Sequence, residues 1–343
     1  MRAWLCLALL LAGGCSRPIP PGVTELVYAT PYSPAHPFSR ADKTWIDYVE
    51  TASNGRIHIR PSWSGALLSE NESMEELRHG VADIGLVTPI YSRGGTHLIR
   101  TQSGFYSGAR TYAAQTALYR CLTAASPEFA RELEGLKVLA VQGGTLPGIV
   151  TRSRPIHSLD DLRGLRLRAP SELLPVLREL GVDPVNMPMG EAYSAMAKGV
   201  IDGVIAPSDT FRSLHFAEVA HHYTALAVPR GAYPARVISL RRWNALPADV
   251  RQILDQSTAV WENALSRETA QAAEQGLDAA RKGHVTVLPI NPAEQARFDA
   301  VYLKDAAHNA DGLAVYGIDG AAVFRAARGA VQPDGSIRCV GAA

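Results

Sequence analysis

Segments rich in β-forming residues alternate with amphipathic segments, and this alternation restricts the fold more than any other feature of the sequence. Strand-like runs at 25–30, 55–63 and 82–88 are separated by stretches with helical periodicity. The same rhythm restarts after a glycine-rich loop and continues over residues 149–207. Because strands that alternate with helices form mostly parallel sheets, the sequence predicts two α/β units.

The connections between these units predict a cleft. More than one segment has to cross from one unit to the other, which favours two lobes that can hinge. Between Pro247 and Lys282 the only glycine is Gly276 and no further proline occurs, so we expect one long helix or two helices in tandem. Ligands of open α/β sheets bind at the carboxyl ends of strands, where the cleft would lie.

The N-terminus is typical of a secretory signal. Arg2 is followed by an apolar run over 3–12, which is too short to span a membrane as a helix. The small residues directly before Cys15 resemble a bacterial lipobox, which implies cleavage before Cys15 and lipidation of its thiol. The alternative is ordinary signal cleavage nearby, with Cys15 incidental. Residues 15–24 are proline-rich and predict a short tether.

Composition excludes some functions. The formal net charge is +1 and falls to zero if residues 1–14 leave with Arg2, so no global field attracts nucleic acid or an acidic membrane. No apolar run of 18 residues follows Cys15, so the sequence predicts no further membrane span.

In an exported chain, Cys121 and Cys339 could form one disulfide or remain two buried thiols, and the sequence leaves both open.

Catalytic motifs are missing from the sequence. It contains neither G-x-S-x-G nor H-E-x-x-H, and the two-glycine turn at 142–144 lacks the lysine of a phosphate-binding loop. We therefore predict no enzyme activity, no cofactor and no metal site.

The sequence does contain arginines that are suited to binding an anion. Arg166 and Arg168 alternate on a short strand that Pro170 ends. A guanidinium group matches a carboxylate with two parallel hydrogen bonds, which makes Arg168 the best candidate for binding an anion. The alternative is a salt bridge between the lobes, with Asp202 or Glu191 as the partner.

Several motifs in a fixed order carry a family resemblance. They are D-L-x-G-x-x-x-R at 161–168, P-x-x-M at 184–187, E-x-Y-x-A-x-x-x-G-x-x-D-G at 191–203 and W-x-x-L-P at 243–247. Over roughly 25–327 the sequence resembles the solute receptors of TRAP (tripartite ATP-independent periplasmic) transporters, the DctP-like family.

The resemblance implies a two-lobed, periplasmic-binding-protein-like α/β fold (type II-like), with a hinge and a long helix that spans both lobes. The boundaries we expect are a signal peptide at 1–14, a tether at 15–24, lobe I at 25–145 plus about 232–265, lobe II at 146–231 plus about 270–328, the long helix at 248–282 and a C-terminal tail at 329–343.

The resemblance also implies the function. The expected protein is a monomeric receptor in the periplasm or cell envelope, lipid-anchored at Cys15, that closes on a small organic acid and delivers it to an ion-driven TRAP transporter in the membrane. A receptor that feeds a sensor kinase and an exported enzyme on the same fold are the alternatives.

The carboxylate-binding arginine of the family falls on Arg168. Met189 stands where relatives place an aromatic residue against the ligand. Relatives often read D-G-Q-E-N-P where this sequence has apolar residues at 204–206, and some carry a second arginine at the position of Gly148. We therefore expect a monocarboxylate with an apolar or aromatic body. The other expected ligand contacts are Tyr32, His36, Tyr91, Gln142, Tyr193, Ser208 and Asp209.

Overall fold

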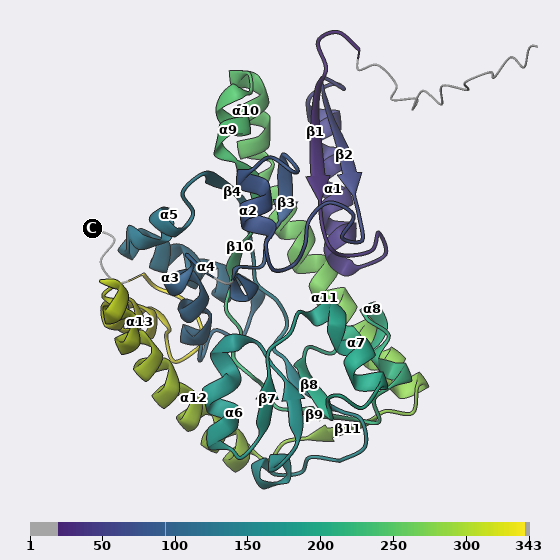
Figure 1. Cartoon of the computed structure of the whole chain (residues 1–343), viewed down its shortest axis with the longest axis vertical. Coiled ribbons are helices and arrows are strands. Elements are labelled where there is room, and N and C mark those ends of the chain that lie inside the picture. The colour runs from purple at the N-terminus through teal and green to yellow at the C-terminus, as the bar shows by residue number, and fades with distance from the viewer. Residues whose placement is uncertain (1–19, 93, 340–343) are drawn as a thin grey trace, which may run out of the picture.

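Two sheets form the centres of two lobes in the computed structural model, which describes residues 20–92 and 94–339 (Figure 1). The expected signal peptide and the lipidation site Cys15 lie outside the described residues. In spatial order, the first sheet consists of β2 (Ile57–Ser62), β1 (Thr24–Ala29), β3 (Ile84–Leu86), β10 (Tyr233–Ser239) and β4 (Leu136–Gln142). The second consists of β11 (Thr286–Pro289), β9 (His222–Ala225), β5 (Gly148–Thr151), β8 (Gly203–Ala206), β6 (Arg166–Arg168) and β7 (Asp183–Val185).

Helices cover both sheets. The α-helices are α1 (Pro37–Ala52), α2 (Ser73–Arg78), α3 (His97–Thr101), α4 (Tyr112–Ala125), α5 (Glu128–Glu132), α6 (Leu174–Glu179), α7 (Met189–Ala197), α8 (Thr210–Ser213), α9 (Leu240–Ala245), α10 (Ala248–Gln256), α11 (Thr258–Lys282), α12 (Pro292–Gly312) and α13 (Gly320–Ala330). Single 3₁₀ turns are η1 (Pro89–Tyr91), η2 (Gln102–Phe105), η3 (Leu159–Leu162), η4 (Ser171–Leu173), η5 (Phe216–Glu218) and η6 (Leu313–Tyr316).

Strand direction follows from where the chain crosses between the lobes. β1 pairs in parallel with β2 and β3, and β6 pairs in parallel with β7 and β8. β10 runs antiparallel to β3 and β4, and β5 runs antiparallel to β8 and β9. β5 and β10 are the strands by which the chain enters a lobe from the cleft, so they run away from it. The sheets are therefore mixed, whereas alternation alone predicts mostly parallel ones.

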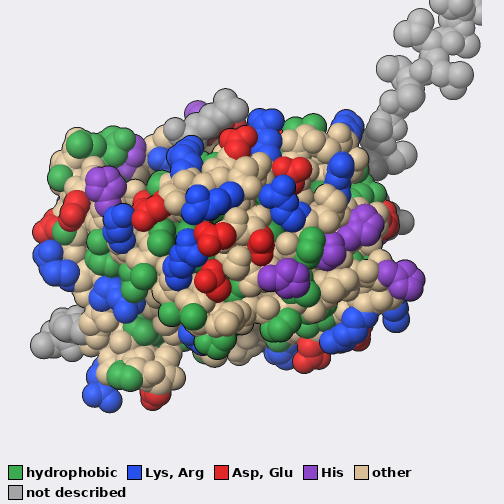
Figure 2. Space-filling view, turned by 90° about the horizontal axis from the view of Figure 1, so that it is seen from below, with side chains coloured by type: hydrophobic (Ala, Val, Ile, Leu, Met, Phe, Trp, Pro, Cys, Tyr) green, Lys and Arg blue, Asp and Glu red, His purple; other side chains and the backbone are tan. Residues whose placement is uncertain are grey.

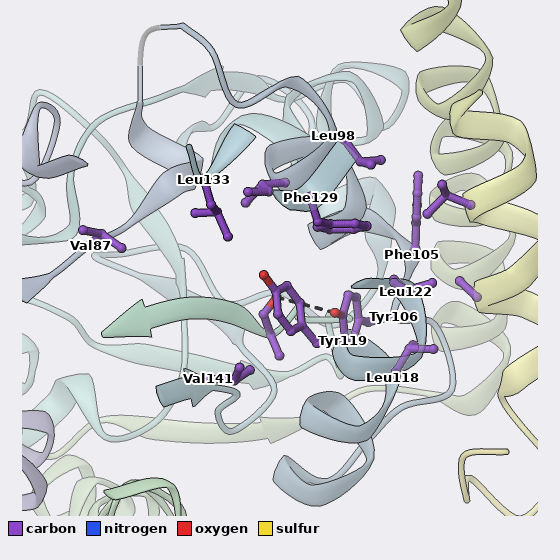
Figure 3. Packing of buried hydrophobic residues seen from close by; sticks show 14 of the residues in the cluster. Val87, Leu98, Phe105, Tyr106, Leu118, Tyr119, Leu122, Phe129, Leu133 and Val141 are labelled. Carbon is purple, nitrogen blue, oxygen red and sulfur yellow. Dashed lines mark hydrogen bonds between the residues drawn. The ribbon is translucent and has the colours of Figure 1, made fainter. Parts of the chain in front are cut away.

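Each sheet buries both faces, because successive side chains of a strand point to opposite sides. Leu26 and Tyr28 of β1 pack into the cluster formed with α1 and α11, and Ala29 packs into the cluster on the other face. Aromatic side chains fill this second cluster, and Figure 3 shows Phe105 and Phe129 pointing into it. The second sheet is sandwiched in the same way, by α6 and α12 on one face and by α7 and α8 on the other. Both lobes therefore have three layers.

The long helical region consists of two helices in tandem, separated at Ser257. The hydroxyl of Ser257 donates to the carbonyl of Leu254 over 2.7 Å and accepts from Nε1 of Trp45 over 2.8 Å. Beyond this break, α11 packs along α1 and continues to α8 in the second lobe (Figure 1). This is the long helix that the sequence predicts across both lobes.

The C-terminal segment contacts both lobes. α12 packs against α6 in the second lobe, whereas α13 packs against α4 in the first. A disulfide between Cys121 and Cys339 ties the tail to α4, which decides between the alternatives left open by the sequence. Our expected boundaries assigned residues up to 328 to lobe II, but the buried residues of α13 belong to a first-lobe cluster.

The helices and the surface charge of the described residues bear on possible membrane and nucleic-acid partners. None of the helices within residues 20–92 and 94–339 combines the length and the apolar character needed to cross a membrane. Figure 2 shows basic and acidic side chains interspersed over one face of the molecule, so this face presents no extended field of a single sign.

A fully buried ion pair lies at the centre of the first lobe. Oδ1 of Asp42 accepts hydrogen bonds from Nε of Arg236 over 2.9 Å and from Nε1 of Trp261 over 2.8 Å. Oδ2 of Asp42 accepts from the Tyr28 hydroxyl, and Arg236 also donates to the side chain of Gln142 over 2.8 Å. These contacts join β1, β4, β10, α1 and α11 in one network.

We expect Asp42→Ala to lower the free energy of unfolding by about 3–5 kcal/mol, because it leaves the Arg236 charge buried without its partner. Chemical denaturation measures this loss. The matched control is Asp249→Ala, which breaks the exposed pair with Arg56 and should cost much less. Equal effects of the two substitutions would contradict a special role for the buried pair.

Candidate functional site

A cavity of about 120 Å³ lies between the lobes where strands of both sheets meet the cleft. Two of the segments by which the chain crosses between the lobes contribute to its wall, at 144–147 and 229–231. Predicted ligand contacts that line it are Tyr32, His36, Tyr91, Arg168, Met189 and Asp209. The sequence therefore identifies much of the wall, because these residues follow the carboxyl ends of strands.

Three predicted contacts do not line this cavity. Gln142 is buried and bonds Arg236 and the Tyr233 hydroxyl with its side-chain amide. The hydroxyl of Tyr193 donates to Glu218 over 2.8 Å, and that of Ser208 donates to the carbonyl of Ala273 over 3.0 Å. All three side chains have partners within the protein.

Arg168 stands at the end of β6 with only 1% of its surface exposed. Its Nε donates to the carbonyl of Met187 over 2.9 Å, and its Nη2 donates to the hydroxyl of Tyr91 from the first lobe. The guanidinium also lies over the Tyr91 ring, 5.7 Å from the centroid. These contacts hold the guanidinium in one orientation within the cavity wall.

The salt-bridge alternative for Arg168 is not realised. Within residues 20–92 and 94–339, no carboxylate oxygen lies within 4.0 Å of its guanidinium. Asp202 instead accepts from the backbone N–H of Arg166 over 2.8 Å. Arg166 is exposed, and its side chain lies 3.6 Å from Asp183. The two arginines of β6 therefore have different environments, and only Arg168 presents a buried positive charge to the cavity.

Aromatic rings form the first-lobe side of the cavity. The rings of Tyr32 and His36 stack with 4.1 Å between centroids, and Phe38 meets the His36 ring edge-on at 4.8 Å. His36 is also the N-cap of α1, since its Nδ1 accepts from the backbone N–H of Phe38. Burial, together with the positive charges of Arg40 and Arg236, lowers the pKa of His36 to about 3, so the ring is neutral near pH 7.

Ile205 gives the second-lobe side of the cavity an apolar surface. Its neighbours Val204 and Ala206 point to the other face of the sheet and are buried there. Gly148 leaves no space for a longer side chain, because a Cβ atom would lie 2.6 Å from the Tyr223 ring and from the carbonyl oxygen of Thr224.

The sequence analysis missed two charged residues of the cavity, Arg230 and Glu172. Arg230 comes from the second crossing segment, after β9, and Glu172 comes from η4, directly after β6. Burial raises the pKa values of Glu172 and of Asp209, and Arg230 opposes both shifts. Their position after strand ends is the signal that identified the other residues, and it could have identified these two.

Metal-binding geometry does not occur in the part of the chain that the structure describes. No three His, Cys, Asp or Glu side chains there are grouped so that they could hold an ion. The cavity can thus offer a buried guanidinium, aromatic and aliphatic walls, and a second charged group at the crossing segments.

Comparison with known proteins finds a matching family and similar structures. Residues 28–308 match the family model of the bacterial extracellular solute-binding proteins, family 7 (DctP). A "Solute-binding protein" of Albidiferax ferrireducens is 26% identical over 60% of this chain, and the alignment spans only 61% of that relative's length.

Two further proteins are similar over more of the chain. The "Monocarboxylate 2-oxoacid-binding periplasmic protein" of a Nostoc species is 25% identical over 74% of this chain and 75% of its own length. A crystal structure of a TRAP solute binding protein from Rhodoferax ferrireducens, in complex with copurified benzoate, superimposes with a TM-score of 0.81. It is 24% identical, with coverage of 90% of this chain and 97% of that one.

His36 should make the fold sensitive to acid. The unfolded chain takes up a proton near pH 6.5, whereas the folded protein does so only near pH 3, so acidification through this range favours unfolding. We expect His36 to account for about 2 kcal/mol of the unfolding free energy lost between pH 7 and pH 5.

His36→Asn tests this expectation, because asparagine can still cap α1 but does not titrate. Denaturation at both pH values should show a smaller loss for the variant than for the parent protein. The control is His79→Asn at an exposed position, which should leave the pH dependence as it is. A parent-like pH dependence in His36→Asn would contradict the assignment.

Proposed function

Because the chain belongs to the bacterial extracellular solute-binding proteins, family 7, we propose that it binds a small monocarboxylate with an apolar or aromatic body in the interlobe cavity. The family consists of transport receptors, so the protein is a solute-binding protein and not an enzyme.

The observation that carries the proposal is the buried charge of Arg168. A buried charge is unfavourable unless it is paired, and no carboxylate in the described part of the chain lies within 4.0 Å of this guanidinium. A ligand carboxylate would supply that pair with two parallel hydrogen bonds. Tyr91 and the carbonyl of Met187 already orient the guanidinium, which reduces the cost of ordering it when the ligand binds.

The remaining wall supports a single carboxylate on an apolar body. Tyr32 and Phe38 offer aromatic surfaces on one side, and Ile205 and Leu173 offer aliphatic surfaces on the other. The similar proteins point the same way, since one is named for monocarboxylate 2-oxoacids and another was solved with benzoate. The small volume of the cavity favours a compact acid.

Calorimetric titration with benzoate and phenylacetate tests this proposal. We expect Arg168→Gln to weaken binding by about 100-fold or more, because it removes both charge-assisted hydrogen bonds. Arg166→Gln is the matched control on the same strand and should bind like the parent protein, since its side chain is exposed. Unchanged affinity of Arg168→Gln would show that the carboxylate binds elsewhere.

A thermal-shift comparison of mono- and dicarboxylates tests the ligand class. A ligand present at 100 times its Kd should add about 2.7 kcal/mol of stability, which raises the melting temperature measurably. Stabilisation by dicarboxylates alone would contradict the argument from the apolar wall.

We further propose that the receptor works in the periplasm or cell envelope, anchored by a lipid on Cys15, and delivers its ligand to the membrane subunits of an ion-driven TRAP transporter. The support is the family membership and the lipobox-like sequence before Cys15. Cys15→Ser should move the protein from the membrane fraction to the soluble fraction after cell lysis. An unchanged distribution would argue against lipidation.

A further inference from the structure

We propose that Arg230 and Glu172 form a second recognition group in the cavity, which binds a hydroxyl group of the ligand and so selects hydroxylated monocarboxylates. This inference rests on the proposed function, because it takes Arg168 as the group that binds the carboxylate. It assigns a specificity-determining role to two further residues of the cavity wall.

Two glycines create the space for Arg230. A Cβ atom on Gly144 would lie 2.6 Å from Cζ and 2.7 Å from Nη1 of Arg230, so the guanidinium packs directly on the backbone of the first crossing segment. Gln115 holds that backbone in place by accepting from the N–H of Gly144 over 2.8 Å. A Cβ atom on the neighbouring Gly231 would lie 2.6 Å from the backbone of Ser103. The position of Arg230 is therefore defined by close backbone packing on both sides.

Arg230 and Glu172 keep hydrogen-bonding capacity that the described residues do not use. Across residues 20–92 and 94–339, Arg230 makes no hydrogen bond and no ion pair within 4.0 Å. Oε2 of Glu172 is buried and has no hydrogen-bond partner there. Buried polar atoms in proteins are almost always bonded, so the free oxygen of Glu172, on the same cavity wall as the partly buried and unbonded Arg230 guanidinium, points to a ligand. A hydroxyl group satisfies both, since it accepts from Arg230 and donates to Glu172.

The local charges favour a neutral group over a second carboxylate. Glu172 and Asp209 both interact with Arg230, and Glu172 also interacts with Arg168, so the arginines of the cavity already have two acidic side chains near them. Asp209 already accepts from the Ser213 hydroxyl over 3.0 Å, whereas Glu172 keeps a free oxygen. A second ligand carboxylate would meet two like charges, but a hydroxyl group would not.

One small ligand can contact both groups. Glu172 has electrostatic interactions with both Arg168 and Arg230. All three residues line the same cavity of about 120 Å³. A hydroxylated acid can therefore place its carboxylate at Arg168 while its hydroxyl group reaches Arg230 and Glu172.

Calorimetric titration with a matched series of acids tests the inference. Phenylacetate is the parent acid, mandelate and 3-hydroxyphenylacetate each add one hydroxyl group, and phenylmalonate adds a second carboxylate. In the unmodified protein we expect at least one hydroxylated acid to bind about 10-fold more tightly than phenylacetate, because it gains a charge-assisted hydrogen bond. Phenylmalonate should bind more weakly than the better hydroxylated acid.

Arg230→Met and Glu172→Gln should reduce this 10-fold preference while phenylacetate still binds, which also shows that the variants are folded. Arg212→Met is the matched control at an exposed arginine outside the cavity and should keep the preference. The inference is overturned if neither hydroxylated acid binds more tightly than phenylacetate, or if Arg230→Met retains the preference.

A third result would also overturn it. If Arg230→Met is folded by circular dichroism but loses phenylacetate together with the hydroxylated acids, Arg230 acts on the whole cavity and not on the hydroxyl group. These outcomes are separate from failure of the proposed function, in which no monocarboxylate of the series would bind the unmodified protein.

Discussion

The buried pair of Asp42 and Arg236 supports the first lobe and, through it, the ligand cavity. Three donors converge on the Asp42 carboxylate, from β1, β10 and α11, so the relative positions of these elements are coupled. Phe38 lies over the Arg236 guanidinium, with 6.0 Å from Cζ to the ring centroid, and the same ring lines the cavity. Phe38 therefore connects the buried charge network to the aromatic wall of the cavity.

The wall of the cavity is formed by residues of both lobes and of the segments that cross between them. The second-lobe sheet supplies Arg168 at the end of β6, and Tyr91 of the first lobe bonds it directly, so this contact joins the two lobes across the cleft. The crossing segments supply Arg230 and the glycine that accommodates it. Residues of the crossing segments thus line the same space as residues at the ends of strands.

The sequence predicts the strands and helices well, because each strand alternates between two buried faces and each long helix has one apolar face. It does not predict that β5 and β10 run antiparallel, since their direction depends on which lobe each strand enters. Arg168 was identifiable because Pro170 ends its strand near the cleft. Gln142 is also the last residue of a strand, but its side chain accepts a hydrogen bond from Arg236, 94 residues later, and does not line the cavity. Contacts over such sequence distances leave no local signal.

The disulfide between Cys121 and Cys339 determines how the molecule responds to mechanical load. The described chain enters the first lobe at β1, and the bond returns its C-terminal end to α4 of the same lobe. The second lobe is consequently an inserted part of the chain with no free end. A force pulling between Thr24 and Cys339 would pass through the first lobe and bypass the second, so it would not load the second lobe.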